Sequence, residues 1–307
     1  MEYSQKLKEI IKAKDITQQA LANDLGVSLL SLNRWINEAS FPRPSNNLKI
    51  DFVYDNIFGV DFSLDKNLKA FLERKKIILE KCKSLNISKI LKRPDFIKNL
   101  NIKLTYASNR IEGSTMTESE VSDILYENLS FSHRSLLEHI EAKNHETAML
   151  YVLDNFKQKI TEDYVKRLHS ILMNSIRSDA GNYRDHNVRI AGSYVPTASH
   201  LSIEKRMKEF VLSLNMLKIK NRDIFNFLSI THSKFEMIHP FSDGNGRIGR
   251  LLLMHLALQN NILPPIILPE HRKKYLTSLQ KSQLENIHND LESGIVEAVE
   301  NTFKLIL

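Results

Sequence analysis

The sequence contains, between residues 239 and 250, the stretch His239-Pro240-Phe241-Ser242-Asp243-Gly244-Asn245-Gly246-Arg247-Ile248-Gly249-Arg250. Its Pro240 disfavours helix at the residue before it, so a helical pattern over 225–237 is expected to end in a turn there. Helical periodicity resumes over 246–258, which places the closely spaced glycines at the N-terminus of a helix. Free backbone N–H groups and the positive end of the helix dipole favour a phosphate at such a place.

Four side chains of this stretch suit phosphate chemistry. Asp243 offers an acceptor-only carboxylate of the kind that holds Mg2+ together with substrate phosphates. Arg247 and Arg250 present planar forks for phosphate oxygens. His239 titrates near neutral pH and is suited to take a proton from an attacking hydroxyl. Together they predict phosphoryl or nucleotidyl transfer.

A dinucleotide-binding site is a rival interpretation, because Gly244, Gly246 and Gly249 also fit the spacing G-x-G-x-x-G. That fingerprint requires a preceding strand and an acidic residue about 20 positions further on. Here a helical pattern precedes the glycines, and Pro264-Pro265 occupies the place of the acidic residue. A capped loop with surface arginines is the other alternative, and it explains neither the histidine nor the paired glycines.

The stretch resembles the signature of the Fic (filamentation induced by cAMP) family, H-x-F-x-D/E-G-N-G-R-x-x-R, at each defined position. The resemblance implies an all-α, Fic-type helical domain with a small β-hairpin flap that transfers AMP from ATP to a Ser, Thr or Tyr hydroxyl of a protein. It implies His239 as the general base and Asp243 as the Mg2+ ligand. It also implies an anion hole and phosphate clamps formed by Gly244, Asn245, Gly246, Arg247 and Arg250. Tyr275 falls where the family places a tyrosine near the nucleotide, although an ordinary core tyrosine would look the same.

A second motif, Ser108-Asn109-Arg110-Ile111-Glu112-Gly113, reads alone as a polar helix end with Gly113 after it. Beside the first motif it resembles the family's inhibitory pattern, S/T-x-x-x-E-G/N. That resemblance implies an inhibitory helix around 104–113 in which Glu112 pairs with Arg250 and displaces the γ-phosphate of ATP. It also implies that Glu112 positions a water that removes AMP from modified targets. The alternative is a surface glutamate at a helix end.

Residues 187–195 alternate in polarity and turn at Ala191-Gly192-Ser193, which predicts a short β-hairpin. Its position upstream of the signature is similar to that of the family's flap. An open hairpin edge can pair with an extended target segment. The candidates for target docking are Val188, Ile190 and Tyr194. A hairpin that only stabilises the domain remains the alternative.

The first 62 residues predict a separate helical domain. Thr17 can cap a helix over 18–25 that Gly26 ends, and Ser28 can cap a second helix running to Asn37. This segment resembles the Cro/phage-repressor helix-turn-helix family, which implies a DNA-reading second helix. The candidate DNA contacts are Gln18, Ser28, Ser31, Asn33 and Asn37. Leu29 and Leu30 depart from the usual polar pattern, so binding to a protein is the alternative.

The length, charge and composition of the chain indicate its expected partners, compartment and domains. The chain has 307 residues, a net charge of +7 and a pI of about 9.2, which favours polyanionic partners or a solvated lysine-rich surface. One cysteine, Cys82, predicts a reducing compartment, and neither a signal peptide nor a membrane span is recognisable, so a cytoplasmic protein without a membrane partner is expected. The expected domains are a helix-turn-helix domain at 1–62, a basic helical connector at 63–103 and a Fic domain at 104–307.

The sequence therefore predicts a protein adenylyltransferase with Mg2+ as cofactor and ATP, a target protein and DNA as partners. One alternative is a DNA-binding regulator whose Fic domain only senses nucleotide. Another is a Fic enzyme that transfers a different phosphate-containing group. The oligomeric state is left open, with a homodimer as one alternative.

Overall fold

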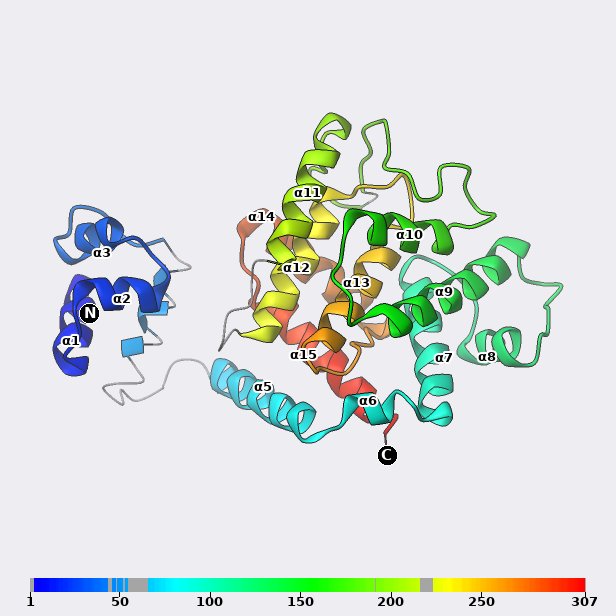
Figure 1. The fold of residues 1–307 in the computed structure, drawn as a ribbon, viewed down its shortest axis with the longest axis horizontal. Helices are drawn as coiled ribbons and strands as arrows, with labels where there is room; N and C mark the ends of the chain where they lie inside the picture. Colours follow the sequence, from blue (N-terminus) through cyan, green and yellow to red (C-terminus); the bar gives the residue numbers. More distant parts are fainter. Residues whose placement is uncertain are drawn as a thin grey trace. The chain divides into compact units, whose positions relative to one another are not determined.

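A computed structural model describes residues 3–43, 46–47, 49–51, 53–54, 66–190, 192–215 and 223–306. The chain divides into two compact units, Met1–Glu73 and Arg74–Leu307 (Figure 1). The predicted boundary at 62/63 lies outside the described residues. The predicted boundary at 103/104 falls inside one continuous helix, α7 (Pro94–Ile111).

The described helices of the first unit include α1 (Tyr3–Lys14), α2 (Gln18–Leu25) and α3 (Leu29–Ile36), and the described residues among 46–54 are also helical. The predicted caps are confirmed: the Thr17 side chain accepts from Ala20 N, and the Ser28 side chain accepts from Ser31 N. Gly26 ends α2 with a φ of 66°, a left-handed conformation that glycine adopts without strain. The apolar faces of the helices enclose a core that includes Leu7, Ile10, Leu21, Leu25, Leu32, Trp35 and Ile36.

Among the described residues of the second unit, every regular element is a helix, and irregular segments connect the helices. The helix α5 (Lys66–Ser84) spans the division between the units, and Arg74 on it donates to Glu300 at 2.8 Å. The other elements are α6 (Ile87–Ile90), α7, α8 (Glu118–Tyr126), α9 (Leu136–Asn155), α10 (Glu162–Leu172), η1 (His200–Ser202), α11 (Ile203–Asn215), α12 (Ile224–Ile238), α13 (Asn245–Gln259), η2 (Pro269–His271), α14 (Arg272–Glu285) and α15 (Asn289–Phe303).

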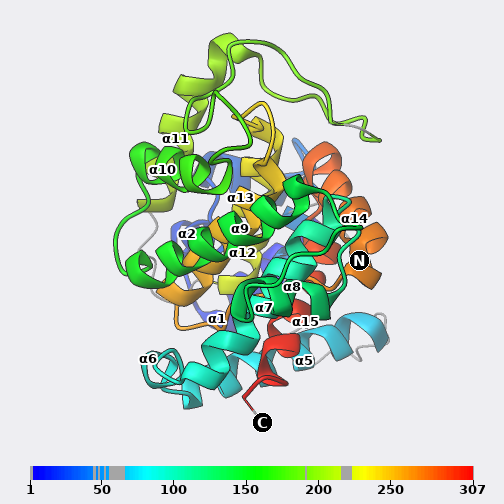
Figure 2. The ribbon, with the colours of Figure 1, turned by 90° about the vertical axis from the view of Figure 1, so that its right-hand side faces the viewer.

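The centre of this unit is α13, which packs against α7, α9, α10 and α12. In Figure 1 it lies between α12 and α9, and Figure 2 shows the same three helices side by side. Its sequence explains this place, because apolar residues occur on every side of the helix from Ile248 to Leu258 and are all buried. The helix before it, α12, is likewise mostly buried. The signature stretch is therefore the connection between the two most buried helices.

The segment between α10 and η1 extends away from the helices in Figure 2 and contains the predicted hairpin. Among its described residues no paired strands form; the arms are joined by a turn bond from Ser193 N to Ile190 O at 3.1 Å and by Thr197 Oγ1 donating to Val188 O at 2.6 Å. Ala191, at the predicted tip, lies outside the described residues. An isolated two-stranded hairpin is marginal in water, and period-two alternation alone does not supply a third strand to support it.

Within the described part of the chain, no helix combines the length and the apolar character needed to cross a bilayer.

Candidate functional site

The loop that carries His239 is fixed by its backbone. His239 ends α12 in a left-handed conformation (φ 51°), with its N–H still bonded to Phe235 O. The buried Arg184 holds the next turn, because its backbone N–H donates to Pro240 O at 3.0 Å and its Nε donates to His239 O at 2.8 Å. A single arginine from the segment after α10 therefore ties that segment to the base-bearing loop.

The imidazole of His239 is held in one tautomer. Its Nδ1 lies 3.2 Å from Glu236 O, and a carbonyl oxygen only accepts, so Nδ1 carries the proton and Nε2 keeps a free lone pair. Burial lowers the pKa of His239 below the ordinary 6.5, since a charged imidazolium loses hydration there. A neutral ring with a free Nε2 is the form that a general base needs at neutral pH.

Phe241 and Asp243 are positioned by His169 on α10. The rings of His169 and Phe241 stack with centroids 3.7 Å apart and planes inclined by 3°. Gly181 N donates to His169 Nδ1 at 2.9 Å, so Nε2 carries the proton and donates to Asp243 O at 3.1 Å. Burial lowers the pKa of His169 to about 4, which keeps this arrangement neutral. Sequence reasoning missed His169, because one histidine on an amphipathic helix carries no local signal.

Asn245 closes the loop with its side chain. Its Oδ1 accepts from Phe241 N at 2.9 Å, and its Nδ2 donates to Phe241 O at 2.8 Å. The amide, only 2% exposed, thus satisfies both backbone groups of a buried residue. The sequence predicts Asn245 in the anion hole. In the structure its side chain holds the loop, so only its backbone N–H remains at the helix N-terminus to contact an anion.

Two glycines make room at the start of α13. Gly244 has a φ of 75°, and a Cβ there would lie 2.9 Å from Met173 Sδ. A Cβ on Gly246 would lie 2.3 Å from Glu112 Oε1. The Glu112 carboxylate therefore rests directly against the first turn of α13, where free N–H groups and the helix dipole favour an anion.

Residues at the end of α7 accept hydrogen bonds from the Arg250 side chain. It donates from Nε to Ser108 Oγ at 3.0 Å, from Nη2 to Ser108 O at 3.0 Å and from Nη2 to Glu112 Oε1 at 2.7 Å. Burial disfavours the guanidinium charge, but Glu112, Tyr275 and Glu236 together favour it and raise the pKa of Arg250 above its ordinary value. Glu112 and Arg250 form an ion pair at 2.7 Å, and the inhibitory role of this pair stays a prediction. Gly113 follows with a φ of 109°, so it turns the chain as glycine allows.

Arg247, the other arginine of the signature, is also paired with a carboxylate. Its Nη1 donates to Glu141 Oε1 on α9 at 2.6 Å, and its Nη2 lies 4.0 Å from Asp243 Oδ1. The arginine is 3% exposed, and its Nε is buried with no protein partner among the described residues. Sequence reasoning missed Glu141, which lies on a separate helix 106 residues earlier.

Asp243 fits the predicted metal-binding role. Its side chain is 57% exposed, and its Oδ1 accepts from Gly244 N at 2.6 Å. No cluster of three or more metal-ligating side chains occurs in the described residues. An open carboxylate beside a phosphate-sized cradle is nevertheless what Mg2+ requires, because this ion takes one or two carboxylates and fills its other positions with phosphate oxygens and water.

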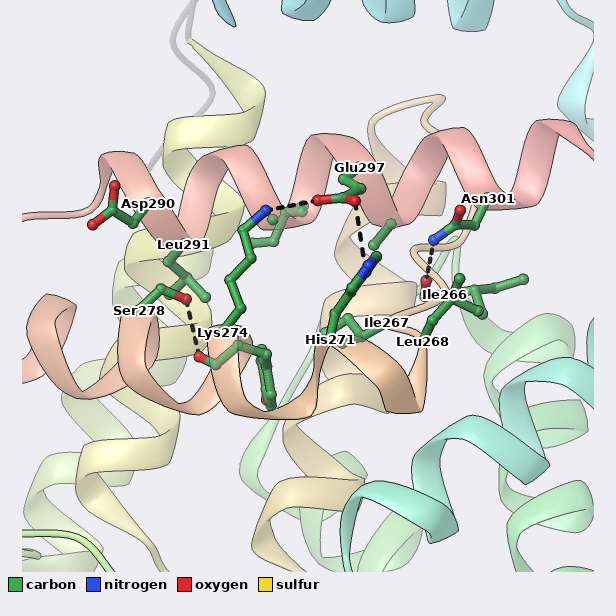
Figure 3. Close-up of a pocket in the computed structure, with 14 residues that line it drawn as sticks. Ile266, Ile267, Leu268, His271, Lys274, Ser278, Asp290, Leu291, Glu297 and Asn301 are labelled. Atoms are coloured by element: carbon green, nitrogen blue, oxygen red, sulfur yellow. Dashed lines mark hydrogen bonds and ion pairs between the residues drawn. The ribbon is translucent and has the colours of Figure 1, made fainter. Parts of the chain in front are cut away.

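Tyr275 is buried beside this network rather than at its open face. Its hydroxyl bonds His232 Nε2 at 2.7 Å, and burial raises its pKa. The residue also lines a hollow between α14 and α15, in which Lys274 and His271 both reach Glu297 (Figure 3). Contact between Tyr275 and a nucleotide stays a prediction.

The remaining candidate residues lie apart from the loop. In the flap segment, Tyr194 is 90% exposed, whereas Val188 and Ile190 are half-buried. The candidate DNA contacts belong to the first unit. There the Ser28 and Ser31 hydroxyls bond each other at 2.8 Å, while Gln18 and Asn37 are exposed and Asn33 is half-buried.

Residues 159–257, which include the whole signature and its supporting helix α10, match the sequence model of the Fic/DOC family. The chain contains a Fic/DOC family domain. It is similar to the protein adenylyltransferase Fic of Nematostella vectensis, with 33% identity over 206 residues, covering 65% of this chain and 46% of the relative. The same-named protein of Aedes aegypti is 30% identical over 248 residues, covering 80% of this chain and 48% of the relative.

The chain thus spans about half the length of the curated relatives it matches. Among solved structures, Fic-1 (residues 134–508) of C. elegans superposes with a TM-score of 0.67 at 21% identity, covering 94% of this chain and 84% of that one. A Fic-domain-containing signaling protein of Bacteroides thetaiotaomicron gives a TM-score of 0.64 at 22% identity, covering 78% of this chain and 97% of that one. These likenesses establish the Fic-type helical fold of the domain.

Proposed function

We propose that this chain is a protein adenylyltransferase that moves AMP from ATP to a Ser, Thr or Tyr hydroxyl of a protein, and that Glu112 holds it inactive. The observation that carries the proposal is the Glu112 carboxylate, which rests on Gly246 and pairs with Arg250 at 2.7 Å. A carboxylate there occupies the place that the loop chemistry reserves for a phosphate. The name shared by the curated relatives, protein adenylyltransferase Fic, supports AMP as the transferred group.

In this proposal His239 performs the proton transfer. Nε2 of the neutral imidazole takes the proton of the target hydroxyl as that oxygen bonds to the α-phosphorus of ATP. The bond from that phosphorus to the oxygen leading to the β-phosphate breaks, and pyrophosphate leaves. His169 and Asn245 keep the loop in place during the step, because both bond its backbone.

The phosphates are held by the cradle at the start of α13. The backbone N–H groups of Asn245 and Gly246, in the first turn of α13, face the anion, and Arg247 and Arg250 neutralise its charge. Asp243 would hold Mg2+, which would offset the negative charge of the phosphates. For the γ-phosphate to reach Arg250, the Glu112 carboxylate must move away.

The flap segment supplies the docking edge for the target in this proposal, with Val188, Ile190 and Tyr194 beside the modified side chain.

The identity of the transferred group distinguishes this proposal from its alternatives. The Glu112→Gly protein should label a protein acceptor from ATP carrying 32P in the α-phosphate and leave it unlabelled from ATP carrying 32P in the γ-phosphate. Label from the γ-phosphate would assign phosphate transfer. If neither form of labelled ATP labels the acceptor, but the protein still binds ATP in a filter assay, the domain would act as a nucleotide sensor.

The acid side of the pH profile follows from the pKa of His239. The base works only when neutral, and burial lowers its pKa below 6.5, so the neutral form persists to lower pH than for a free imidazole. Transfer by Glu112→Gly should therefore be flat between about pH 7 and 8 and fall only below about 6.5. Initial rates measured with saturating ATP across this range check it. A midpoint above 7 would contradict the assignment of His239 as a buried neutral base.

For the first unit we propose DNA binding through α3. The support is local: two capped helices are joined by a turn at the left-handed Gly26, and the polar Ser28 caps the N-terminus of α3. Phosphate contacts are strongly salt-dependent, so affinity for duplex DNA should fall by at least about ten-fold between 50 and 200 mM salt. A gel shift of the full chain, with Gln18→Ala and Asn33→Ala weakening the complex, tests this. If the chain does not bind duplex DNA, or binds it with an affinity that salt does not change, the partner of α3 would be a protein.

A further inference from the structure

The last turn of α7 is held from outside by Arg272. Its Nε donates to Ile111 O at 2.6 Å. That carbonyl belongs to the same planar peptide unit as the N–H of Glu112, so fixing the oxygen fixes the direction in which the chain enters Glu112. A guanidinium at this place also meets the negative end of the helix dipole.

Glu112 depends on such support, because its backbone N–H bonds to Asn109 O of α7 and its position therefore follows the end of that helix. Its side chain is 41% exposed, and Arg250 is the one partner of its carboxylate among the described residues. Gly113 follows, with open space around the position of a Cβ, so the chain has a pivot directly after the inhibitory residue. Beyond the pivot, Glu138 accepts from Thr115 N at 2.8 Å and from Thr115 Oγ1 at 3.0 Å. The inhibitory residue therefore lies between two anchors.

The Arg272 anchor is itself secured to the core. Arg272 is the first residue of α14, and the residues around it, His271 and Lys274, reach Glu297 of α15 at 3.6 and 3.0 Å (Figure 3). The buried side of α15 then packs against α12, the helix that ends at His239. The support for Glu112 thus comes from the same helices that position the base.

We propose that Arg272 is a positioning residue for inhibition: it holds the end of α7 so that Glu112 stays on Arg250 and Gly246. The proposal rests on the proposed function of this site. Among the described residues, Arg272 forms no hydrogen bond or ion pair with the signature loop or Arg250, so its loss should release inhibition without removing any group that acts on ATP. Because Arg272 is exposed, solvent weakens its bond to this carbonyl, and its loss should shift such a balance by about five-fold.

The test compares Arg272→Ala, Arg272→Lys and Lys273→Ala, each in the full chain and each with and without Glu112→Gly. Lys273→Ala is the matched control, because it removes a positive charge from the same turn. The Lys273 side chain forms no hydrogen bond or ion pair among the described residues. Transfer of label from α-labelled ATP should rise about five-fold in Arg272→Ala, less in Arg272→Lys and not in Lys273→Ala. In the Glu112→Gly background Arg272→Ala should add nothing. An unchanged rate in Arg272→Ala, or an equal rise in both backgrounds, would overturn the proposal.

A second readout separates this proposal from the proposed function. Amide hydrogen exchange over 112–116, followed by mass spectrometry without ATP, should be faster in Arg272→Ala than in Lys273→Ala or the unchanged chain. The amides of Glu112, Gly113 and Ser114 report directly, since all three bond to the last turn of α7. If Glu112→Gly transfers no AMP, the proposed function fails while exchange still tests the anchor. Unchanged exchange in Arg272→Ala overturns the anchor itself.

Discussion

Replacing Glu112 by glycine is expected to raise AMP transfer roughly 10- to 100-fold above the unchanged chain. The carboxylate bonds Arg250 at 2.7 Å and covers Gly246, so its removal frees both the clamp and the cradle for the phosphates of ATP. A charge-assisted hydrogen bond contributes about 1.5–3 kcal/mol, and the 41% exposure of Glu112 favours the lower part of that range. The measurement is the initial rate of incorporation of 32P from α-labelled ATP into protein.

Matched variants separate the charge of Glu112 from its bulk. Glu112→Gln keeps the shape and loses the ion pair, so its rate should lie between those of the unchanged chain and Glu112→Gly. Glycine at this position introduces no backbone strain, because Glu112 ends α7 with a φ of −83°. We also propose that Glu112 orients the water that removes AMP from a modified target, so Glu112→Gly should lose release of AMP from a previously modified target. Equal transfer by the unchanged chain and Glu112→Gly would remove the inhibitory assignment.

Replacing His239 by asparagine in the Glu112→Gly background is expected to lower transfer by about 100- to 10,000-fold. The imidazole supplies the free Nε2 that accepts the hydroxyl proton, and the asparagine amide nitrogen has no basic lone pair. Asparagine is chosen because His239 has a φ of 51°, a left-handed conformation that asparagine tolerates better than alanine. The fold of the loop should therefore survive the change.

Two readouts accompany the His239 variant. Its thermal midpoint should stay within a few degrees of that of Glu112→Gly, and its affinity for ATP should be nearly unchanged, since the clamps remain. A large fall in rate with intact folding and ATP binding assigns His239 to the chemical step. Retention of more than about a tenth of the rate would assign the proton transfer to another group.

The sequence was sufficient for features that depend on neighbouring residues. Pro240 after an apolar helix required a turn, and the glycines that follow placed the next helix start; both occur where expected, between α12 and α13. The same holds for Thr17, Gly26 and Ser28, whose capping roles are local. The pairing of Glu112 with Arg250 spans 138 residues and was reached only through resemblance to the family.

Partners brought from distant helices had no local signal. Glu141 of α9 pairs with Arg247, and His169 of α10 stacks on Phe241, but glutamate and histidine are common on helices and nothing in the sequence near either residue points to its partner. Arg184 holds the backbone of His239 and Pro240 through contacts that only the folded loop creates. The flap shows the opposite case, because its alternating sequence predicts strands, yet its described residues form a turn without strand pairing.

The central claim is that this loop transfers AMP and that Glu112 blocks it at Arg250. Intact-mass spectrometry of the chain itself after incubation with ATP and Mg2+, beside a protein acceptor mixture labelled from α-labelled ATP, tests it most directly. The account predicts a mass gain of one AMP, or AMP label in the acceptors, for Glu112→Gly, with little for the unchanged chain and none for Glu112→Gly with His239→Asn. A gain of phosphate instead of AMP, or equal modification of all three proteins, would contradict it.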